Sequence, residues 1–362
     1  MTAFITSIGV LSPLGSGREE FVEAWRAGRS ADRIGDGPEA GGVKLPKYKA
    51  AALYPDHRKA FRRMDRLSKI ICSGIAHARD DAAGFGDLEN LGLAVGTDYG
   101  TLTETWKFLS RLKAKGPALC NPMDFPNLVP NAGAGYAGIF LGLRGPSHTF
   151  CRHETCGDEA VAWIADGIAA GWIEAGVGSG AEELGETLAR ATRAASGWSV
   201  AQPLGEGAAA VLLETPDRAA ARGAEVRARF LGSWGASTPS GRSALLLPDR
   251  LDGLVELIRR SLDATRTAAG DVGVALLSHP DHPALQAAVA TALGRDVPRT
   301  DHHRRVGTHP ADGAFRVALA ALLLADRSLP VHADGDGCRG RAALVVTCAR
   351  GGGLRVSVVG AA

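Results

Sequence analysis

The chain has 362 residues, with 41 Lys or Arg and 39 Asp or Glu, so its formal net charge at pH 7 is only +2. This balance provides no strong overall field for nucleic acid or for an anionic membrane surface. Hydrophobic residues make up 45% of the chain, accompanied by 47 glycines and 18 prolines. Such a composition indicates a compact α/β protein with many tight connections and excludes a disordered chain.

The lengths of the apolar runs and the spacing of the cysteines predict where in the cell the chain is found. Residues 1–15 carry no basic segment before their apolar residues, and the longest apolar run, at 317–325, is too short to span a bilayer. We therefore expect a soluble cytoplasmic protein without a membrane partner. The six cysteines have no framework spacing, which predicts reduced thiols, most of them in the core. They are Cys72, Cys120, Cys151, Cys156, Cys338 and Cys348.

In the first half, strand and helix patterns follow one another. Residues 4–13 alternate and run into Ser-Pro, which predicts a strand and a loop. The spacing of Phe21 and Trp25 predicts a helix around 19–28, with a glycine at its end. Further helices are predicted at 68–84, 102–116 and 159–171, and further strands at 91–97, 147–151, 175–182 and 207–214.

The second half repeats this rhythm in a shorter form. Because strands alternate with helices of 10 to 15 residues in both halves, we predict two parallel-rich sheets covered by helices and an internal duplication. The halves would be 1–220 and 221–362, meeting in the polar, turn-rich segment 215–225. The predicted strands are 226–237, 272–280 and 341–349, and the predicted helices are 250–265, 282–294 and 314–326.

Six short segments, taken in order, carry a family resemblance. They are ITSIGVLSPLG (5–15), FRRMDRLSK (61–69), PNLVPNAGAG (126–135), GLRGPSHT (142–149), GSGAEE (178–183) and GEGAAAVLLE (205–214). Together they resemble the β-ketoacyl synthases, the condensing enzymes with the thiolase fold, over almost the whole chain. The resemblance implies a five-layered αβαβα core of two similar halves, and a dimer in which strands pair across the two-fold axis.

The resemblance also implies a defined chemistry. Its enzymes join an acyl chain held on a cysteine to a malonyl unit on an acyl carrier protein. The cysteine lies at the N-terminus of a buried helix, where unpaired N–H groups and the helix dipole favour a thiolate. Two histidines from the second half stabilise the enolate that forms when carbon dioxide leaves.

The cysteine position of the family can be counted from two anchors. The nucleophile follows the glycine of "GP" by nine residues and precedes the glutamate of "GAE" by twenty-eight. Counting from Gly145 and counting from Glu182 both lead to Glu154. Cys156 lies two residues further on, a rotation of about 200° along a helix, so its side chain would point away from the pocket. We interpret Cys156 and Cys151 as buried, inert thiols.

The second half departs from the family pattern around its histidines. His279 matches the first histidine, but the loop that follows it is shorter and lacks the expected threonines. His309 matches the second histidine, and Arg304 stands where the family has a lysine. The glycine-rich Gly-Phe-Gly-Gly stretch, whose phenylalanine gates the family's site, has its counterpart in GCRGR at 337–341.

A carboxylate at position 154 predicts a subunit that does not carry an acyl chain. An acyl anhydride on Glu154 would hydrolyse readily, although the helix N-terminus tolerates the negative charge. Loss of the cysteine is typical of the chain-length factors, the non-acylating partners of ketosynthases in type II polyketide synthases. Glu154 and the shortened loops favour a divergent branch such as the polyene-forming, highly reducing systems. The implied partners are a catalytic ketosynthase, in a heterodimer, and an acyl carrier protein bearing the growing chain.

In that interpretation the chain forms part of an acyl tunnel. The strand at 147–150 and the segment 121–131 would line it, and bulky side chains there would limit chain length by steric exclusion. The candidate length-setting residues are Asp124, Phe125, Asn127 and Leu128. Two simpler interpretations stay open: Phe125 as ordinary core, and Asp124 or Asn127 as a turn cap.

A competing hypothesis is an active enzyme. It would be an atypical condensing enzyme or a malonyl-carrier-protein decarboxylase, using Glu154, His279 and His309, or Cys156. No cofactor is implied. A metal site at the histidines 302, 303 and 309 is not predicted because no carboxylate or cysteine lies at a ligand spacing, and 302–305 is interpreted as a solvated basic loop.

Overall fold

The computed structural model describes residues 2–37, 39–194, 203–238, 247–248, 251–333 and 335–362. Its strands are β1 (Ala3–Ser12), β2 (Gly15–Ser16), β3 (Gly92–Gly96), β4 (Ser147–Phe150), β5 (Ala175–Glu182), β6 (Gly207–Glu214), β7 (Ala228–Ser237), β8 (Val272–Leu277), β9 (Ala342–Cys348) and β10 (Gly353–Ala361). Its helices are α1 (Arg18–Arg26), α2 (Arg58–Phe61), α3 (Arg66–Asp81), α4 (Leu102–Lys115), α5 (Ala132–Leu141), α6 (Cys156–Ala169), α7 (Glu186–Ala194), α8 (Pro216–Ala221), α9 (Asp252–Thr265), α10 (Pro283–Leu293), α11 (His302–Val306) and α12 (Gly313–Ala325). Short 3₁₀ helices are η1 (Ala50–Ala52), η2 (Pro55–His57), η3 (Pro117–Leu119), η4 (Pro122–Asn127) and η5 (Ala269–Asp271).

The two halves of the sheet repeat one arrangement. The strand order is β4-β3-β5-β6-β1-β7-β10-β9-β8, with β2 attached to β1. In the first half β3 and β5 are parallel, whereas β5–β6 and β6–β1 are antiparallel. In the second half β8 and β9 are parallel, whereas β9–β10 and β10–β7 are antiparallel. The halves join through three residue pairs between β1 and β7, and α8 lies in the connection.

The prediction of two parallel-rich sheets is wrong. The described strands form one hydrogen-bonded sheet in which six pairings are antiparallel and three are parallel. The reason lies in the connections: β9 reaches β10 through a short turn rather than a crossover helix, and a short turn makes neighbours antiparallel. The predicted helix at 250–265 begins at Asp252, and residue 250 lies outside the described residues.

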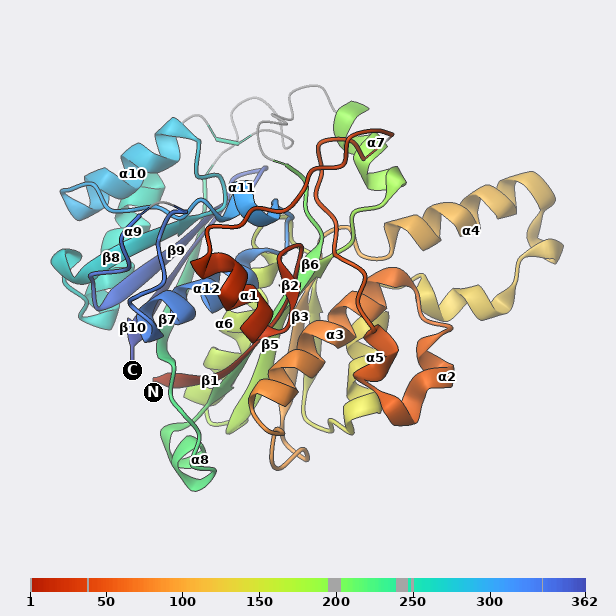
Figure 1. Cartoon of the computed structure of the whole chain (residues 1–362), viewed down its shortest axis with the longest axis horizontal. Helices are drawn as coiled ribbons and strands as arrows, with labels where there is room; N and C mark the ends of the chain where they lie inside the picture. The colour runs from red at the N-terminus through yellow and green to blue at the C-terminus, as the bar shows by residue number, and fades with distance from the viewer. Residues whose placement is uncertain (1, 38, 195–202, 239–246, 249–250, 334) are drawn as a thin grey trace.

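Five layers result from folding the two sheet halves around buried helices, as the resemblance implied (Figure 1). Helices α6 and α12 lie between the halves in a central hydrophobic core. Helices α3 and α5 cover the outer face of the first half, whereas α9 and α10 cover the outer face of the second. The apolar run at 317–325 lies in α12, which is buried from Gly313 to Leu324, as expected of a helix that is hydrophobic all round. None of the helices described could cross a membrane.

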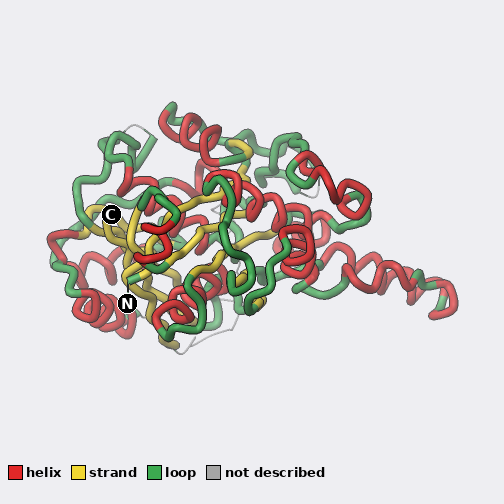
Figure 2. The backbone as a smooth tube through the Cα atoms, turned by 90° about the horizontal axis from the view of Figure 1, so that it is seen from below, coloured by secondary structure: helices red, strands yellow, loops and turns green. Residues whose placement is uncertain are grey.

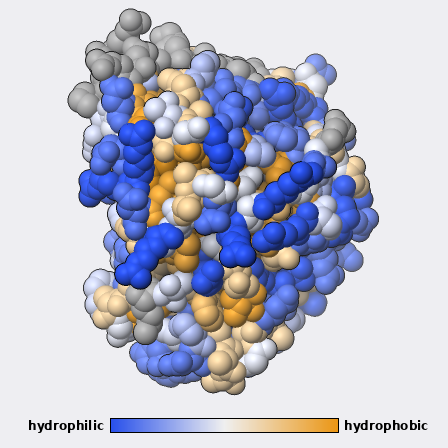
Figure 3. Space-filling model, turned by 90° about the vertical axis from the view of Figure 1, so that its left-hand side faces the viewer, coloured by the Kyte–Doolittle hydropathy of each residue, from blue (hydrophilic) through white to orange (hydrophobic). Residues whose placement is uncertain are grey.

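An arm projects from the body of the molecule. Helix α4 and the short helices η3 and η4 extend away from the sheet, as Figures 1 and 2 show. No residue of α4 is buried, and most of the large exposed hydrophobic side chains lie on this arm and its base. They are Trp106, Leu109, Leu119, Met123, Phe125 and Val129. On the side of the molecule away from the arm, the surface is mostly hydrophilic with narrow hydrophobic strips (Figure 3).

Candidate functional site

The site is built on a sharp corner between β4 and α6. The chain leaves β4, which pairs in parallel with β3, and turns through His153 in a left-handed conformation with φ 49°. The amide of His153 donates to Asp98 Oδ1 (2.8 Å), and the hydroxyl of Thr155 donates to the carbonyl of Arg152 (2.8 Å). These bonds fix the corner, and α6 then begins at Cys156. We call residues 151–156 the elbow.

Glu154 lies inside the elbow, against the second half of the chain. Its residue exposure is only 5%. The amide of Arg350 donates to Glu154 Oε2 (3.1 Å), and the Arg350 guanidinium forms an ion pair with Glu154 Oε1. Burial raises the pKa of Glu154 above its usual range, and the charge of Arg350 opposes that rise. The carboxyl group is therefore held by a cation that belongs to the loop after β9.

The two thiols nearest to Glu154 differ from each other. Cys156 is fully buried, and its Sγ donates to the carbonyl of Pro310 (3.8 Å). Burial, together with Glu182, raises the pKa of the Cys156 thiol well above its usual value, so it is not a thiolate near pH 7. The prediction of a buried Cys151 is wrong: this thiol is exposed, because β4 is the terminal strand of the sheet.

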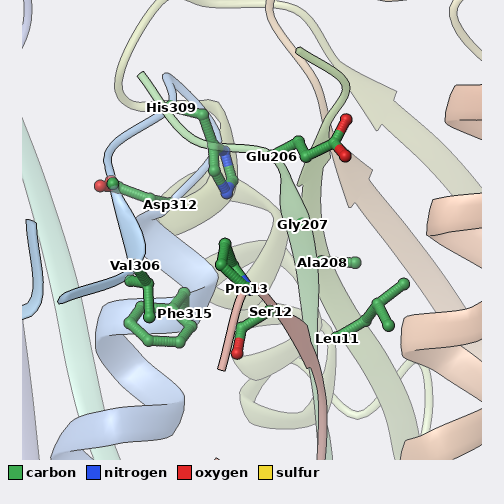
Figure 4. Close-up of a pocket in the computed structure, with 11 residues that line it drawn as sticks. Leu11, Ser12, Pro13, Glu206, Gly207, Ala208, Val306, His309, Asp312 and Phe315 are labelled. Atoms are coloured by element: carbon green, nitrogen blue, oxygen red, sulfur yellow. The ribbon is translucent and has the colours of Figure 1, made fainter. Parts of the chain in front are cut away.

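The two histidines of the second half are partly buried, and each has a buried ring nitrogen, near the fixed positive charge of Arg316. Burial and the charges of Arg350 and Arg316 lower the pKa of His279 to about 3, and burial and Arg316 lower that of His309 to about 3. Both rings are therefore neutral near pH 7. Nε2 of His279 and Nδ1 of His309 have no hydrogen-bond partner among the described residues. In the small pocket of Figure 4, His309 points toward Pro13.

A hydrogen-bond network around the buried Arg316 lies behind the elbow, and no sequence pattern predicted it. Arg316, on α12, is fully buried and donates to Asp312 Oδ1 (3.1 Å), to the carbonyl of Val346 (3.0 Å) and to Thr347 Oγ1 (2.8 Å). Its guanidinium also lies 3.5 Å from Asp158 Oδ2 on α6. Burial raises the pKa of Asp312 to about 6, against the effect of Arg316.

Acid–arginine pairs thus connect the first turn of α6 to the second half of the chain. Besides Asp158 with Arg316, Glu159 lies 3.5 Å from Arg355 of β10, and Glu154 pairs with Arg350. All three acids come from 154–159. Their negative charges stand at a helix N-terminus, where the dipole favours them. The elbow and the first turn of α6 therefore form a junction of ion pairs between the two halves.

The glycine-rich stretch beside the elbow is not the one expected. Residues 337–341 lie before β9, where Gly340 packs against Gly273 and the amide of Arg341 donates to the carbonyl of Asp271 (2.8 Å). The loop that contacts Glu154 is 349–353, Ala-Arg-Gly-Gly-Gly, at the other end of β9. The residues beside Glu154 therefore come from the glycine-rich segment after β9 and not from the predicted one before it.

The four candidate length-setting residues lie on η4 and directly after it. Asp124 accepts from the Arg111 guanidinium (2.6 Å) and from the amide of the Asn121 side chain (3.0 Å). Phe125 is 64% exposed, so it is not core in this chain alone. Asn127 donates to the carbonyl of Arg63 (3.2 Å), and Leu128 is partly buried.

A groove runs beside the predicted tunnel strand. It is open to solvent, has a volume of about 910 Å³ including its open side, and lies between the start of α5 and β4. Its lining includes Asn131, His148 and Cys151. One wall is therefore the terminal strand of the sheet, and nothing in the described chain covers the opposite side.

The histidines at 302 and 303 do not form the predicted solvated loop. They lie in α11 and are buried, with Arg305. The Arg305 guanidinium donates to the carbonyl of Trp25 (2.7 Å) and lies 3.7 Å from the centre of the Trp25 rings. The basic residue is thus part of the packing at the end of α1. In the part of the chain that is described, no three His, Cys, Asp or Glu residues could hold a metal ion.

Known proteins resemble this chain in sequence over part of its length. The chain is 30% identical over 264 residues to 3-oxoacyl-[acyl-carrier-protein] synthase 2 of Vibrio harveyi, and 29% identical over 252 residues to nodulation protein E of Rhizobium leguminosarum bv. trifolii. Each match covers 63% of this chain and 61% of the relative, so the chain spans less than two thirds of the relatives' length. No family model matches.

Solved structures match the whole chain. The ishigamide ketosynthase/chain length factor and a β-ketoacyl synthase from Burkholderia phymatum STM815 each superpose with a TM-score of 0.85 at 19% identity, over 100% of this chain and 99% of theirs. The chain has the fold of the β-ketoacyl synthases and resembles them in sequence. Another ketosynthase-type match, with a TM-score of 0.76 at 15% identity, is AntDE:AntF, a type II polyketide synthase carrier protein in complex with its ketosynthase.

Proposed function

We propose that this ketosynthase-like chain is a non-acylating, chain-length-factor subunit that pairs with a catalytic ketosynthase during chain elongation on acyl carrier protein. The observation that carries the proposal is the elbow: Glu154, which motif counting assigns to the nucleophile position, is buried and paired with Arg350. The nearest alternative nucleophile, Cys156, is fully buried with a strongly raised pKa. A chain with this elbow contributes shape rather than acyl transfer.

The surface around β4 supports a protein partner. β4 is the terminal strand of the sheet, so one of its edges is free to pair with another chain. The helices that pack against β4 also carry exposed hydrophobic side chains: Ile139 of α5 is 71% exposed, and Trp172, just after α6, is 66% exposed. With the apolar arm, these side chains offer hydrophobic surface that a protein partner would cover. A related but catalytic chain, with an intact cysteine and two histidines, is the partner we propose.

The groove beside β4 supports the tunnel role. A partner that pairs with β4 would close the open side of the groove and convert it into a channel. Phe125, exposed on the arm, would then face the partner, whereas Asp124 and Asn127 hold the arm's fold through their hydrogen bonds. We therefore expect Phe125 and Leu128 to set the chain length, with Asp124 and Asn127 positioning them.

An exposed basic patch at the base of the arm supports binding of a carrier protein. Arg58, Lys59, Arg62 and Arg63 are all exposed or partly exposed, and Asn127 ties this segment to η4. A cluster of four cations would attract the phosphate of a phosphopantetheine arm and an acidic protein surface. The patch would place a carrier protein beside the tunnel.

The test is co-expression with a candidate catalytic ketosynthase, one with an intact cysteine and two histidines, sought first among the neighbouring genes, followed by mass analysis of the products. We expect a stable heterodimer, and shorter products when Leu128→Phe or Phe125→Trp narrows the tunnel. Asp36→Ala, on an exposed loop, is the matched control and should leave product length unchanged. Unchanged products in both tunnel variants would remove the tunnel assignment.

The competing function is decarboxylation or condensation by the chain itself. What favours it is the pair of neutral histidines, each with a buried ring nitrogen that has no partner among the described residues. Neutral histidines can donate to a thioester oxygen. The decisive measurement is malonyl-carrier-protein decarboxylation by the chain alone. Activity that Glu154→Ala abolishes would replace the partner proposal with the enzymatic one.

A further inference from the structure

Arg350 contacts the Glu154 carboxyl group at two separate atoms. The backbone amide of Arg350 contacts Glu154 Oε2 (3.1 Å), and the guanidinium contacts Oε1. The amide contact fixes the loop itself, and the guanidinium contact places a charge over the elbow. The Arg350 guanidinium also lies 3.5 Å from the hydroxyl of Tyr99.

Arg350 is the outer member of the pair. The side chain of Glu154 is 7% exposed and that of Arg350 is 12% exposed, so the pair is largely shielded from solvent, with Arg350 slightly the more exposed. The loop begins directly after β9 and continues through Gly351, Gly352 and Gly353 into β10. Gly351 and Gly352 have φ values of 81° and 92°, which other residues adopt rarely. The backbone is therefore shaped to return Arg350 over the elbow.

We propose that Arg350 is a lock residue: it pairs with Glu154 to hold the loop 349–353 closed over the elbow, so that no thioester reaches position 154. The lock acts in the isolated chain and needs no partner. Its consequence, that a growing acyl chain is delivered only to the partner's cysteine, rests on the proposed function. The pair also explains why a buried carboxylate is tolerated here, because a buried charge without a counter-charge is strongly unfavourable.

A probe thiol at position 154 separates obstruction from electrostatics. In Glu154→Cys the guanidinium of Arg350 would stand beside the new thiol, and a neighbouring cation favours the reactive thiolate. Charge alone would therefore speed alkylation, whereas a closed loop would slow it. The two effects have opposite signs, so the measured rate identifies the dominant one.

The first experiment compares iodoacetamide labelling of the introduced thiol at position 154 in three variants by peptide mass spectrometry. They are Glu154→Cys, Glu154→Cys with Arg350→Gly, and Glu154→Cys with Arg355→Gly. The last is the matched control, since Arg355 pairs with Glu159 in the first turn of α6 and not with position 154. We expect labelling at least tenfold faster only when Arg350 is removed. Labelling of the exposed Cys151 shows that the reagent is active, and absence of labelling at the buried Cys156 shows that the fold is intact. Equal or faster labelling with Arg350 present would overturn the lock.

The second experiment needs no new cysteine. Hydrogen exchange of the Arg350 amide is measured in the native chain, in Glu154→Ala and in Glu159→Ala. We expect exchange at least tenfold faster in Glu154→Ala and unchanged exchange in Glu159→Ala. Equal acceleration in both variants would show general loosening rather than a lock. Neither experiment depends on heterodimer formation or product length, so the lock and the proposed function can fail independently.

Discussion

Glu182 offers a sharp test of the buried electrostatics. It ends β5, is fully buried, and its Oε1 accepts from the amide of Tyr99 (3.1 Å), the hydroxyl of Thr97 (3.1 Å) and the amide of Asp98. Burial raises the pKa of Glu182 from 4.5 to about 8, in spite of these donors. The folded chain therefore binds this proton more tightly than the unfolded chain does.

The sign of the pH effect follows from that shift. The stability associated with protonated Glu182 is fully present below pH 4.5 and is lost as the pH rises toward 8. At about 1.4 kcal/mol for each pKa unit, a shift of this size corresponds to at most about 5 kcal/mol above pH 8. Glu182→Gln is a neutral mimic of the protonated acid: its amide oxygen can accept the same three hydrogen bonds, and it cannot ionise.

The assay is urea denaturation of the native chain and of Glu182→Gln between pH 5 and 9. We expect the two free energies of unfolding to differ by less than about 1 kcal/mol at pH 5, and the advantage of the variant to grow steadily from there to about pH 8, toward the upper value of about 5 kcal/mol. Taking the difference between the two curves removes the contribution of Asp312, which titrates in the same direction. Parallel curves across the whole range would refute the conclusion that Glu182 is buried as a neutral acid.

Three further perturbations test the network, the histidines and the arm. Arg316→Met should lower the free energy of unfolding by about 3 to 5 kcal/mol in urea denaturation, because it leaves two buried carboxylates without their cation; a loss below about 1 kcal/mol would contradict this. The lowered pKa values of His279 and His309 mean that the unfolded chain binds more protons below pH 6.5, so stability should fall as the pH drops toward 3. Replacing both histidines with Gln should flatten the acid side of the stability curve, and an unchanged slope would argue against neutral rings with lowered pKa values. Trp106→Ser, at a side chain 59% exposed, should weaken association with the ketosynthase at least tenfold in titration calorimetry while leaving the melting temperature of the chain alone unchanged; unchanged affinity would remove the arm from the interface.

Local patterns predicted most elements, and long-range packing explains those they missed. The helix α5 (Ala132–Leu141) contains glycines at 133, 135 and 138, which favour a loop by propensity. Tertiary packing overrides this preference: a Cβ at Gly133 would lie 2.5 Å from Ile71 Cδ1 of α3, so the glycine permits close contact between the two helices. The strand β10 had a usable signal, since alternating apolar residues follow Gly353, but the predicted elements ended at residue 349.

At the candidate site, too, local patterns predicted part of the arrangement and long-range packing determines the rest. Counting from anchors matched Glu154 to the residue that the family keeps at a helix N-terminus, whereas the helix itself was predicted to begin only at 159; α6 begins at Cys156, two residues after Glu154. Its partner Arg350 lies 196 residues away, on the other half, and no local pattern reports that contact. The same limit applies to Arg316, which reads as an isolated charge in an apolar helix and is the centre of a buried network. Sequence patterns place residues on elements, whereas the register between the halves decides which residues meet.

Glu154 and Arg350 are therefore best understood as one unit. A carboxylate alone at this depth would be costly, and an arginine alone over a buried thiol would be equally unpaired. Changing only Glu154 to cysteine would leave the Arg350 guanidinium at the elbow and the loop 349–353 unchanged in sequence. We therefore expect Glu154→Cys to remain inactive in condensation, and only the additional change of Arg350 to expose a thiol to acyl donors. Acyl transfer by the single variant at the rate of the double variant would show that the missing cysteine is the sole barrier.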